Sequence, residues 1–200
     1  MNTETKFLTN VLLIDVAALN NEAASMRRAM SWGLKRELHL MDMTKWLTCL
    51  ALDGDVLRYG PDIQVILVYD RPDTQISVSE NPDFIKCDGL SFFIPEVGEF
   101  TISCVHTAGM TDTKSLFFDL MHLTLDSDQV KNLIILPSEQ VYGQTVKEEL
   151  DHIAKEQGEQ IAEKACLFGI YPAEKQEVYR QRIVTMSWAH VFGITPDDVK

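Results

Sequence analysis

Apolar runs and helix-type patterns alternate along the first third of the chain. Residues 11–14 and 63–69 are continuous apolar runs, the pattern typical of strands buried on both faces of a sheet. Between these runs the sequence predicts a helix over about residues 22–30, capped by Asn20 or by the asparagine after it. A second helix is expected after Asp42. The segment therefore has the outline of a strand–helix–strand unit.

The rest of the chain continues this alternation. Further strands are expected over residues 100–106, 132–136 and 165–170, and further helices over residues 109–126, 142–157 and 173–192. Strands that alternate with helices favour a parallel sheet covered by helices on both faces. We therefore predict a single α/β domain over residues 1–200, folded as a three-layer α/β/α sandwich of Rossmannoid type with a mainly parallel sheet.

The segment at about residues 71–99 differs from its surroundings. Prolines and glycines divide it into two short β-like pieces, at residues 75–79 and 90–94. A structureless loop of this length is unusual inside a compact domain. We expect a β-hairpin-like arm that projects from the sheet.

Composition and charge narrow the classes of protein. Hydrophobic residues make up 46% of the 200 residues, and the formal net charge is -12, which excludes wholesale disorder and disfavours a broad basic face. The four cysteines show no pairing or zinc-ligand pattern, so reduced thiols in the cytoplasm are expected. No apolar segment approaches the roughly 20 residues that a membrane-spanning helix needs, so no membrane association is expected.

Acidic side chains follow three of the predicted strands directly. Asp15 and Asp70 end the first two strands, and Ser138 and Glu139 form a turn after the strand at residues 132–136. In open α/β sheets, ligands bind beyond the carboxyl ends of the strands. Neighbouring carboxylates repel one another unless a cation bridges them, and Mg²⁺ or Mn²⁺ is the usual cation. The alternative is that each acid only caps a nearby helix.

The predicted helix at residues 109–126 carries one polar stripe on a largely apolar surface. The stripe consists of Asp112, Ser115, Asp119, His122 and Asp126, at spacings of three and four residues. In one interpretation the first two aspartates of this stripe complete the acidic cluster at the strand ends. In the other, the whole stripe faces solvent.

The order of these motifs resembles the NYN branch of the PIN-like nuclease domains. The matching features are Asp15 followed by Asn20, Gly109 to Asp112 before the acidic helix, and the turn from Pro137 to Tyr142. The resemblance implies a PIN/NYN-like fold and a metal-dependent ribonuclease that acts on RNA. On this reading Asp15, Asp112 and Glu139 are catalytic, and the Mg²⁺ or Mn²⁺ ligands are Asp15, Asp70, Asp112, Asp119 and Glu139.

The same comparison of motifs also shows departures from the family pattern. The second aspartate of the family's turn is replaced by Val141, and the glycine of that turn is missing. Losing a carboxylate removes a metal ligand and lowers the affinity for a divalent cation. A weakened or inactive relative is therefore the second form of this hypothesis, and a non-catalytic protein-interaction or oligomerisation module is the alternative.

Local motifs bear on three further kinds of partner: RNA, a dinucleotide and a second copy of the chain. A basic stretch that contains one tryptophan predicts RNA contact or, alternatively, a solvated helix face; its residues are Arg27, Arg28, Trp32, Lys35 and Arg36. No GxGxxG or GxxxxGK[ST] sequence is present, so no dinucleotide is expected as a ligand. The apolar surface of the helix at residues 173–192 favours a homodimer.

Overall fold

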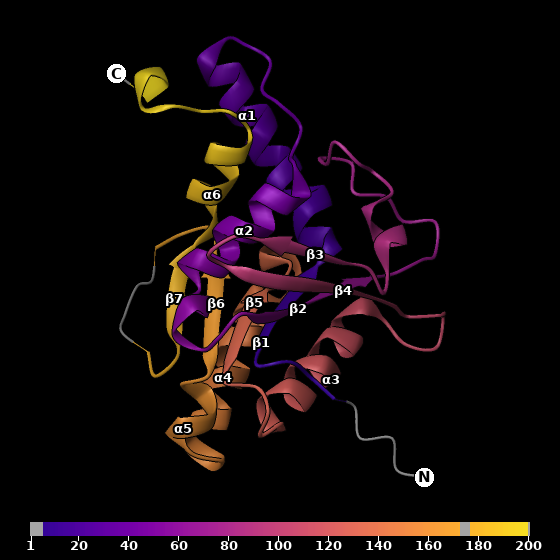
Figure 1. Ribbon diagram of the computed structural model, residues 1–200, viewed down its shortest axis with the longest axis vertical. Helices are drawn as coiled ribbons and strands as arrows, with labels where there is room; N and C mark the ends of the chain where they lie inside the picture. The colour runs from indigo at the N-terminus through magenta and orange to yellow at the C-terminus, as the bar shows by residue number, and fades with distance from the viewer. Residues whose placement is uncertain (1–5, 173–176, 200) are drawn as a thin grey trace.

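The computed structural model describes residues 6–172 and 177–199, and a seven-stranded sheet runs through the centre of the molecule (Figure 1). The strands lie in the order β3-β4-β2-β1-β5-β6-β7. Their bounds are β1 (Asn10–Asp15), β2 (Asp62–Tyr69), β3 (Ser91–Ile94), β4 (Gly98–His106), β5 (Asn132–Leu136), β6 (Ala165–Gly169) and β7 (Arg180–Ile183). All neighbours pair in parallel except β3, which pairs with β4 in the antiparallel sense.

Helices cover both faces of this sheet (Figure 1). Their bounds are α1 (Ala24–Leu34), α2 (Met43–Asp53), α3 (Thr113–Asp126), α4 (Gln144–Glu156), α5 (Glu159–Ala162) and α6 (Val184–Val191). Shorter turns are the π-helical η1 (Ala18–Ala23) and η4 (Glu139–Gly143), and the 3-10 turns η2 (Val56–Arg58), η3 (Phe84–Cys87) and η5 (Pro196–Val199). The predicted α/β architecture with a mainly parallel sheet is confirmed.

Alternate residues of the strands feed two separate apolar cores. Leu12 and Ile14 of β1 face α2 and α6, whereas Val11 and Leu13 face α3 and α4. Every residue of β1 and of β5 is buried. These two strands lie at the centre of the sheet and are covered on both sides, which explains their unbroken apolar sequence.

The segment between β2 and β4 is packed against the molecule, which corrects the prediction of a projecting arm. Of its two predicted β-like pieces, only the second forms a strand, β3. In the first piece, Ile76 and Val78 are both buried in the core, and the N–H of Ser79 turns back to the carbonyl of Ile76 at 3.0 Å. A side chain from η1 also holds this piece, because Asn20 bonds the carbonyl of Gln75 and the N–H of Ser77. Asn20 is therefore not the helix cap that the sequence predicted.

The C-terminal region differs from the predicted helix at residues 173–192. Residues 177–192 contain the edge strand β7 followed by the short helix α6, and the start of the predicted helix, residues 173–176, lies outside the described residues. Arg180 and Arg182 of β7 both bind Asp55. An edge strand can carry polar side chains in place of the apolar residues of a buried strand. The sequence pattern of β7 was therefore interpreted as part of a helix.

Polar side chains join three strands at the amino ends of the sheet. The amide of Asn132 donates to Asn10 at 3.1 Å and to the carbonyl of Gly54 at 2.9 Å. The guanidinium of Arg180 donates to the oxygen of Asn132 and to Asp55. This amino-end network links β1, β5 and β7 on the side of the sheet opposite the strand ends that carry Asp15 and Glu139.

Within residues 6–172 and 177–199, no helix is long and apolar enough to span a membrane.

Candidate functional site

The order of the strands reverses between β1 and β5. From β1 the chain builds the sheet outward through β2 and β4, and from β5 it builds outward in the other direction through β6 and β7. The crevice beyond the carboxyl ends of two such strands is the usual ligand position in α/β folds. Asp15 ends β1, and Ser138 and Glu139 follow β5, so the sequence located these residues at the correct edge of the sheet.

Each of the two central strands leads into a π-helical turn. η1 follows β1, η4 follows β5, and the two turns contact each other. Single π-helical turns are rare and are found often at functional sites. Unusual backbone geometry therefore follows the carboxyl ends of both central strands.

Asp15, at the carboxyl end of β1, points into the protein. Its side chain is 1% exposed, and its oxygens accept hydrogen bonds from the N–H of Ala17 at 2.8 Å and from the hydroxyl of Tyr142. Beside it, Glu22 is 3% exposed and accepts from the hydroxyl of Ser138 at 2.9 Å. We call Asp15, Glu22, Ser138 and Tyr142 the sealed cluster.

Burial controls the protonation of this sealed cluster. Loss of hydration raises the pKa of Asp15, and the nearby Glu22 adds to that increase, while the bonds from Tyr142 and Ala17 oppose it. The pKa of Tyr142 is raised by burial and by the Asp15 carboxylate. The phenol therefore keeps its proton and remains the donor to Asp15. One oxygen of Glu22 has no hydrogen-bond partner among the described residues.

The other predicted acidic residues lie apart from the sealed cluster. Asp112 is exposed and caps α3, and the N–H and hydroxyl of Ser115 lower its pKa. Asp119 is exposed on α3, and Asp70 is exposed and accepts from the hydroxyl of Thr107 at 3.3 Å. Asp112 therefore acts as a helix cap, which was the alternative to a role in a metal site.

These positions do not form the predicted metal site. Within residues 6–172 and 177–199, no three His, Cys, Asp or Glu side chains are placed to hold a metal ion. Asp15 is turned inward toward Tyr142, and Asp112 is engaged at the end of its own helix. The residues present therefore do not fit the Mg²⁺ or Mn²⁺ that the resemblance implied.

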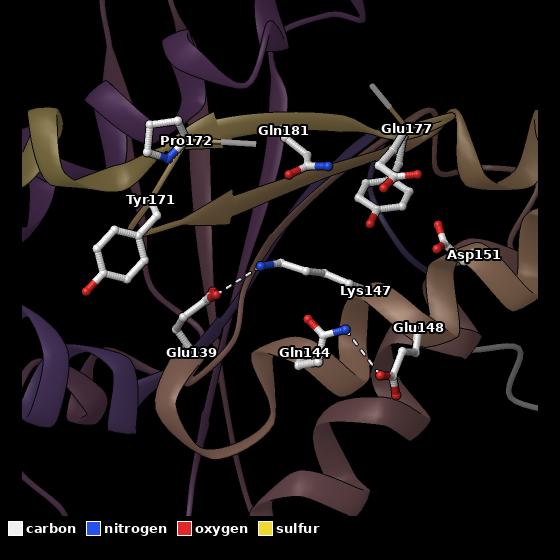
Figure 2. Close-up of a pocket in the computed structure, with 10 residues that line it drawn as sticks. Glu139, Gln144, Lys147, Glu148, Asp151, Tyr171, Pro172, Glu177 and Gln181 are labelled. Atoms are coloured by element: carbon white, nitrogen blue, oxygen red, sulfur yellow. Dashed lines mark hydrogen bonds and ion pairs between the residues drawn. The ribbon is translucent and has the colours of Figure 1, made fainter. Parts of the chain in front are cut away.

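An open pocket lies next to the sealed cluster, between α4 and the edge strand β7, and reaches the carboxyl ends of β5 and β6 at Glu139 and Tyr171. Its volume is about 410 Å³. α4 supplies one wall, and β7 with the residue before it supplies the opposite wall (Figure 2). Its lining residues are Glu139, Gln144, Lys147, Glu148, Asp151, Tyr171, Pro172, Glu177, Tyr179 and Gln181.

Glu139 connects the pocket to η4. Its carboxylate accepts from the ammonium of Lys147 at 3.1 Å, and the side chain is 18% exposed (Figure 2). A Cβ atom at Gly143 would lie 2.9 Å from the carboxylate, so a residue without a side chain at this position leaves room for it. The second carboxylate oxygen is buried and has no hydrogen-bond partner within the described chain.

Tyr179 and Gln181 line the β7 side of the pocket. Tyr179 is buried, with 3% of the residue exposed, and Gln181 is half-buried. Burial raises the pKa of the Tyr179 hydroxyl, and Asp151 and Glu177 add to the increase. The lining of the pocket is therefore mostly polar, and one buried oxygen of Glu139 is the atom there that lacks a described partner.

Comparison with known families places the chain in one of them. A family model described as "Family of unknown function (DUF6621)" matches residues 4–199. The chain belongs to this family. No curated protein and no solved structure matches it.

In this DUF6621 member the predicted basic stretch lies on and after α1, and it separates into two groups. Arg27 donates to the carbonyls of Leu38 and His39, and Arg36 pairs with Asp198 at 2.9 Å, so both guanidinium groups hold their own chain. The remaining three residues, Arg28, Trp32 and Lys35, are exposed along one side of α1 and its C-terminus. Trp32 is 86% exposed.

Several residues of this region were not anticipated from the sequence. Glu22 is a single acid in a run of small and apolar residues, and that isolation was a usable signal of burial. No comparable indication exists in the sequence for Tyr142, because a tyrosine after a turn is usually interpreted as an ordinary core residue. Lys147 and Tyr179 enter the pocket only through the packing of α4 against β7, which the sequence pattern did not predict.

Proposed function

We propose that this chain is a non-catalytic binding module, and that the open pocket beside β5 and β6 is its binding site. The observation that carries the proposal is the state of Asp15. This residue holds the position at which a hydrolase of this architecture places an acid, but it is 1% exposed and bonded to Tyr142 and Ala17.

The sealed cluster opposes metal-dependent hydrolysis for two physical reasons. A cation at Asp15 has to displace the Tyr142 hydroxyl and reach a carboxylate that water does not reach. In addition, a raised pKa favours the protonated acid, which does not ligate a cation. A metal-dependent ribonuclease that uses Mg²⁺ or Mn²⁺ is therefore the less favoured hypothesis.

The order of the parallel strands and the acid at the end of β1 agree with a PIN/NYN-like ancestry. We propose the chain as an inactive relative of that group. The acid at β1 is retained here as a structural residue, since its partner Tyr142 comes from the turn that departs from the family's metal-binding sequence.

Three features support the open pocket as the binding site. At Glu139 it reaches the carboxyl end of β5, where α/β proteins bind ligands, and its volume of about 410 Å³ falls in the range of small-molecule sites. One buried oxygen of Glu139 has no hydrogen-bond partner in the described part of the chain. Buried polar groups without partners cost free energy, and a bound ligand removes that cost.

A nuclease assay tests the proposal. Single-stranded RNA is incubated with the protein in millimolar Mn²⁺, and Asp15→Asn is the matched variant. We expect no cleavage by either protein and no change in melting temperature on adding Mn²⁺, because a ligand that binds only the native state raises that temperature. Mn²⁺-dependent cleavage that Asp15→Asn abolishes would overturn the proposal.

A second candidate function is RNA binding through α1. The observation that favours it is the exposed indole of Trp32 between Arg28 and Lys35, since an aromatic ring can stack on a base while cations contact the phosphates. A homodimer and a cytoplasmic location remain predictions from the sequence.

A further inference from the structure

The edge strand β3 leaves part of its main chain unpaired. Within residues 6–172 and 177–199, β3 has a sheet neighbour, β4, on one side only (Figure 1). We infer that β3 binds an extended segment of another protein, which adds a strand to this edge, has an apolar centre and carries lysine or arginine at its ends. No residue of β3 lines the open pocket, so this inference goes beyond the proposed function.

The register of β3 against β4 shows which main-chain groups point outward. The carbonyl of Leu90, directly before β3, accepts from the N–H of Ile102 in β4 at 2.9 Å. In an antiparallel pair, residues whose main chain faces the partner strand alternate with residues whose main chain faces away. The N–H and C=O groups of Ser91 and Phe93 therefore point away from β4, and both residues are exposed. These two residues offer two donors and two acceptors to an added strand.

The two edges of the sheet differ in how they are protected. Charged side chains and prolines usually keep an edge strand from pairing with other chains. The edge strand β7 carries Arg180 and Arg182, whereas β3 has the sequence Ser-Phe-Phe-Ile, without a charge or a proline. Phe93 is 67% exposed. The β3 edge is therefore the one that is open to a further strand.

The side chains of β3 indicate which residues the added strand carries at its centre. The half-buried ring of Phe92 stacks on that of Phe100 with their centres 4.8 Å apart, and the side chain of Phe93 lies on the opposite face of the sheet. Side chains directly opposite on neighbouring strands lie about 4.5–5.5 Å apart, and aromatic and β-branched residues pair well there. We therefore expect aromatic or β-branched residues at the centre of the bound segment.

Carboxylates lie beyond both ends of β3. Asp88 precedes the strand, Glu96 follows it, and Glu99 lies on the neighbouring strand β4; all three are exposed. The nearest cation along the chain, Lys86, is already paired with Asp83 at 2.8 Å. A segment with lysine or arginine at its ends therefore complements the charge of this edge.

The same charges disfavour a second copy of this chain at the β3 edge. Two antiparallel β3 strands that bond through their outward groups place Ser91 of one copy opposite Phe93 of the other. That register brings Asp88 of one copy toward Glu96 of the other at both ends, so like charges meet. Each chain also has a formal net charge of -12, which opposes self-association. A basic segment of another protein is the better match.

Fluorescence anisotropy with the full chain and a labelled peptide tests the inference. The probe is a short blocked peptide with valine and tyrosine at its centre and lysines at both ends. We expect it to bind, and its affinity to fall as salt is added. The same peptide with glutamates in place of the lysines should bind at least about tenfold more weakly. The lysine peptide with N-methylated central amides should not bind, because it cannot donate main-chain hydrogen bonds.

Two variants at one position measure the main-chain contribution. Phe93→Pro removes an N–H that points away from β4, so it leaves the bonds between β3 and β4 in place. Phe93→Ala also loses the ring but keeps the N–H. We expect Phe93→Pro to bind the lysine peptide about three- to tenfold more weakly than Phe93→Ala, the effect of one hydrogen bond. Circular dichroism verifies that both variants are folded.

Charge-neutralising variants test the contribution of the flanking carboxylates. Glu96→Gln should weaken binding of the lysine peptide by about two- to fourfold, the effect of one exposed ion pair. Glu156→Gln is the matched control, since Glu156 is an exposed carboxylate on α4. It should leave the affinity unchanged, because distant exposed charges are screened.

Hydrogen exchange followed by NMR identifies the edge that is bound. The N–H groups of Ser91 and Phe93 should exchange more slowly in the presence of the lysine peptide. Absence of binding by this peptide, equal binding by its N-methylated form, or protection of another element instead of β3 overturns the inference. Dimerisation of the unaltered chain that protects the same two N–H groups also overturns it, because the occupant is then a second copy. The N-methylated peptide needs no change in the protein, so the test holds even if Phe93→Pro does not fold.

Discussion

The sealed cluster and the open pocket are neighbours near the carboxyl end of β5, and both take residues from the turn around η4. Tyr142 points from this turn into the sealed cluster and bonds Asp15, while Glu139 points into the pocket and bonds Lys147. On one side a buried acid is held by donors of its own chain. On the other, the acid is paired with a lysine at an open pocket. Each region also holds one buried carboxylate oxygen without a described partner, on Glu22 and on Glu139.

This difference shows that the position of an acid at a strand end does not determine its role. Asp15 and Glu139 both follow a central strand, and the sequence assigned both to the same metal site. The neighbouring residue decides how each carboxylate is used by the fold: the Tyr142 hydroxyl binds one oxygen of Asp15, and Gly143 leaves space beside the carboxylate of Glu139.

The largest effect is expected from truncating the buried phenol of the sealed cluster. Tyr142→Ala removes a ring that is 3% exposed and leaves Asp15 without its donor, so we expect a loss of about 3–5 kcal/mol in the free energy of unfolding. Tyr171→Ala in the open pocket removes a largely exposed ring and should change this free energy by less than about 0.5 kcal/mol. Urea unfolding followed by circular dichroism measures both.

Similar losses from Tyr142→Ala and Tyr171→Ala would contradict the contrast between the two regions. Tyr142→Phe refines the result, because it keeps the ring and removes only the hydroxyl. It should cost about 1–3 kcal/mol, the price of leaving a buried acceptor unsatisfied.

A smaller effect should appear in the pH dependence of stability. Burial raises the pKa of Asp15 in the folded state above its unfolded value of about 3.9, so the folded state holds the proton more tightly. The stabilisation from this group is complete below the unfolded pKa and is lost as pH rises through the folded pKa, with a slope of at most about 1.4 kcal/mol per pH unit.

Asp15→Asn isolates this contribution, since asparagine keeps the shape and does not titrate. The unfolding free energy of the unaltered chain minus that of Asp15→Asn, measured from acid to neutral pH, should fall with rising pH and then level off. A difference that rises with pH would mean that Asp15 is stabilised as a carboxylate, and the cluster would then be a usable anionic site.

The smallest effect on stability is expected at α1, away from both regions. Trp46 and Trp188 are buried at 0% and 1% exposure, so Trp32 alone among the three tryptophans reports on the solvent-exposed surface. Single-stranded RNA at low salt should quench its fluorescence, and Arg28→Ala should weaken the quenching. Trp32→Phe should abolish the quenching while changing stability by less than about 0.5 kcal/mol.

Asp15→Asn is the control for this measurement. It should leave the quenching by RNA unchanged, since the sealed cluster is closed to ligands. Quenching that responds to Asp15→Asn and not to Arg28→Ala would relocate the RNA to the strand ends and break the distinction between a closed and an open region.

Much of the fold was predictable because central parallel strands carry continuous apolar sequence. The bounds of β1, β2, β4, β5 and β6 all lie within two residues of their predicted positions. β7 was missed because an edge strand is paired on one side only and carries two arginines that bind Asp55. The strand-like piece predicted at residues 75–79 was wrong. Ile76 and Val78 alternate with polar residues as in a strand, but the backbone forms a turn there and both side chains are buried in the core.

The sequence predicted at which edge of the sheet the site residues lie, but not the directions of their side chains. Strand ends meet at one edge of a parallel sheet, so the sequence located Asp15 and Glu139 correctly. The direction of each carboxylate depends on contacts between distant residues, such as the bond from Tyr142 to Asp15 and the packing of Glu139 against Gly143. Such pairings have no periodicity that a single sequence can display.

The amino-end network ties the last strand of the sheet to the central and first strands. Arg180 comes from the last strand and donates to Asn132 in the middle of the sheet, whose amide also holds Asn10 of the first strand. A shorter chain that stopped after β6 would leave the oxygen of Asn132 without its charged donor in a dry interior. The final strand is therefore an integral part of the folding unit, and the first and last segments of the chain become stable together.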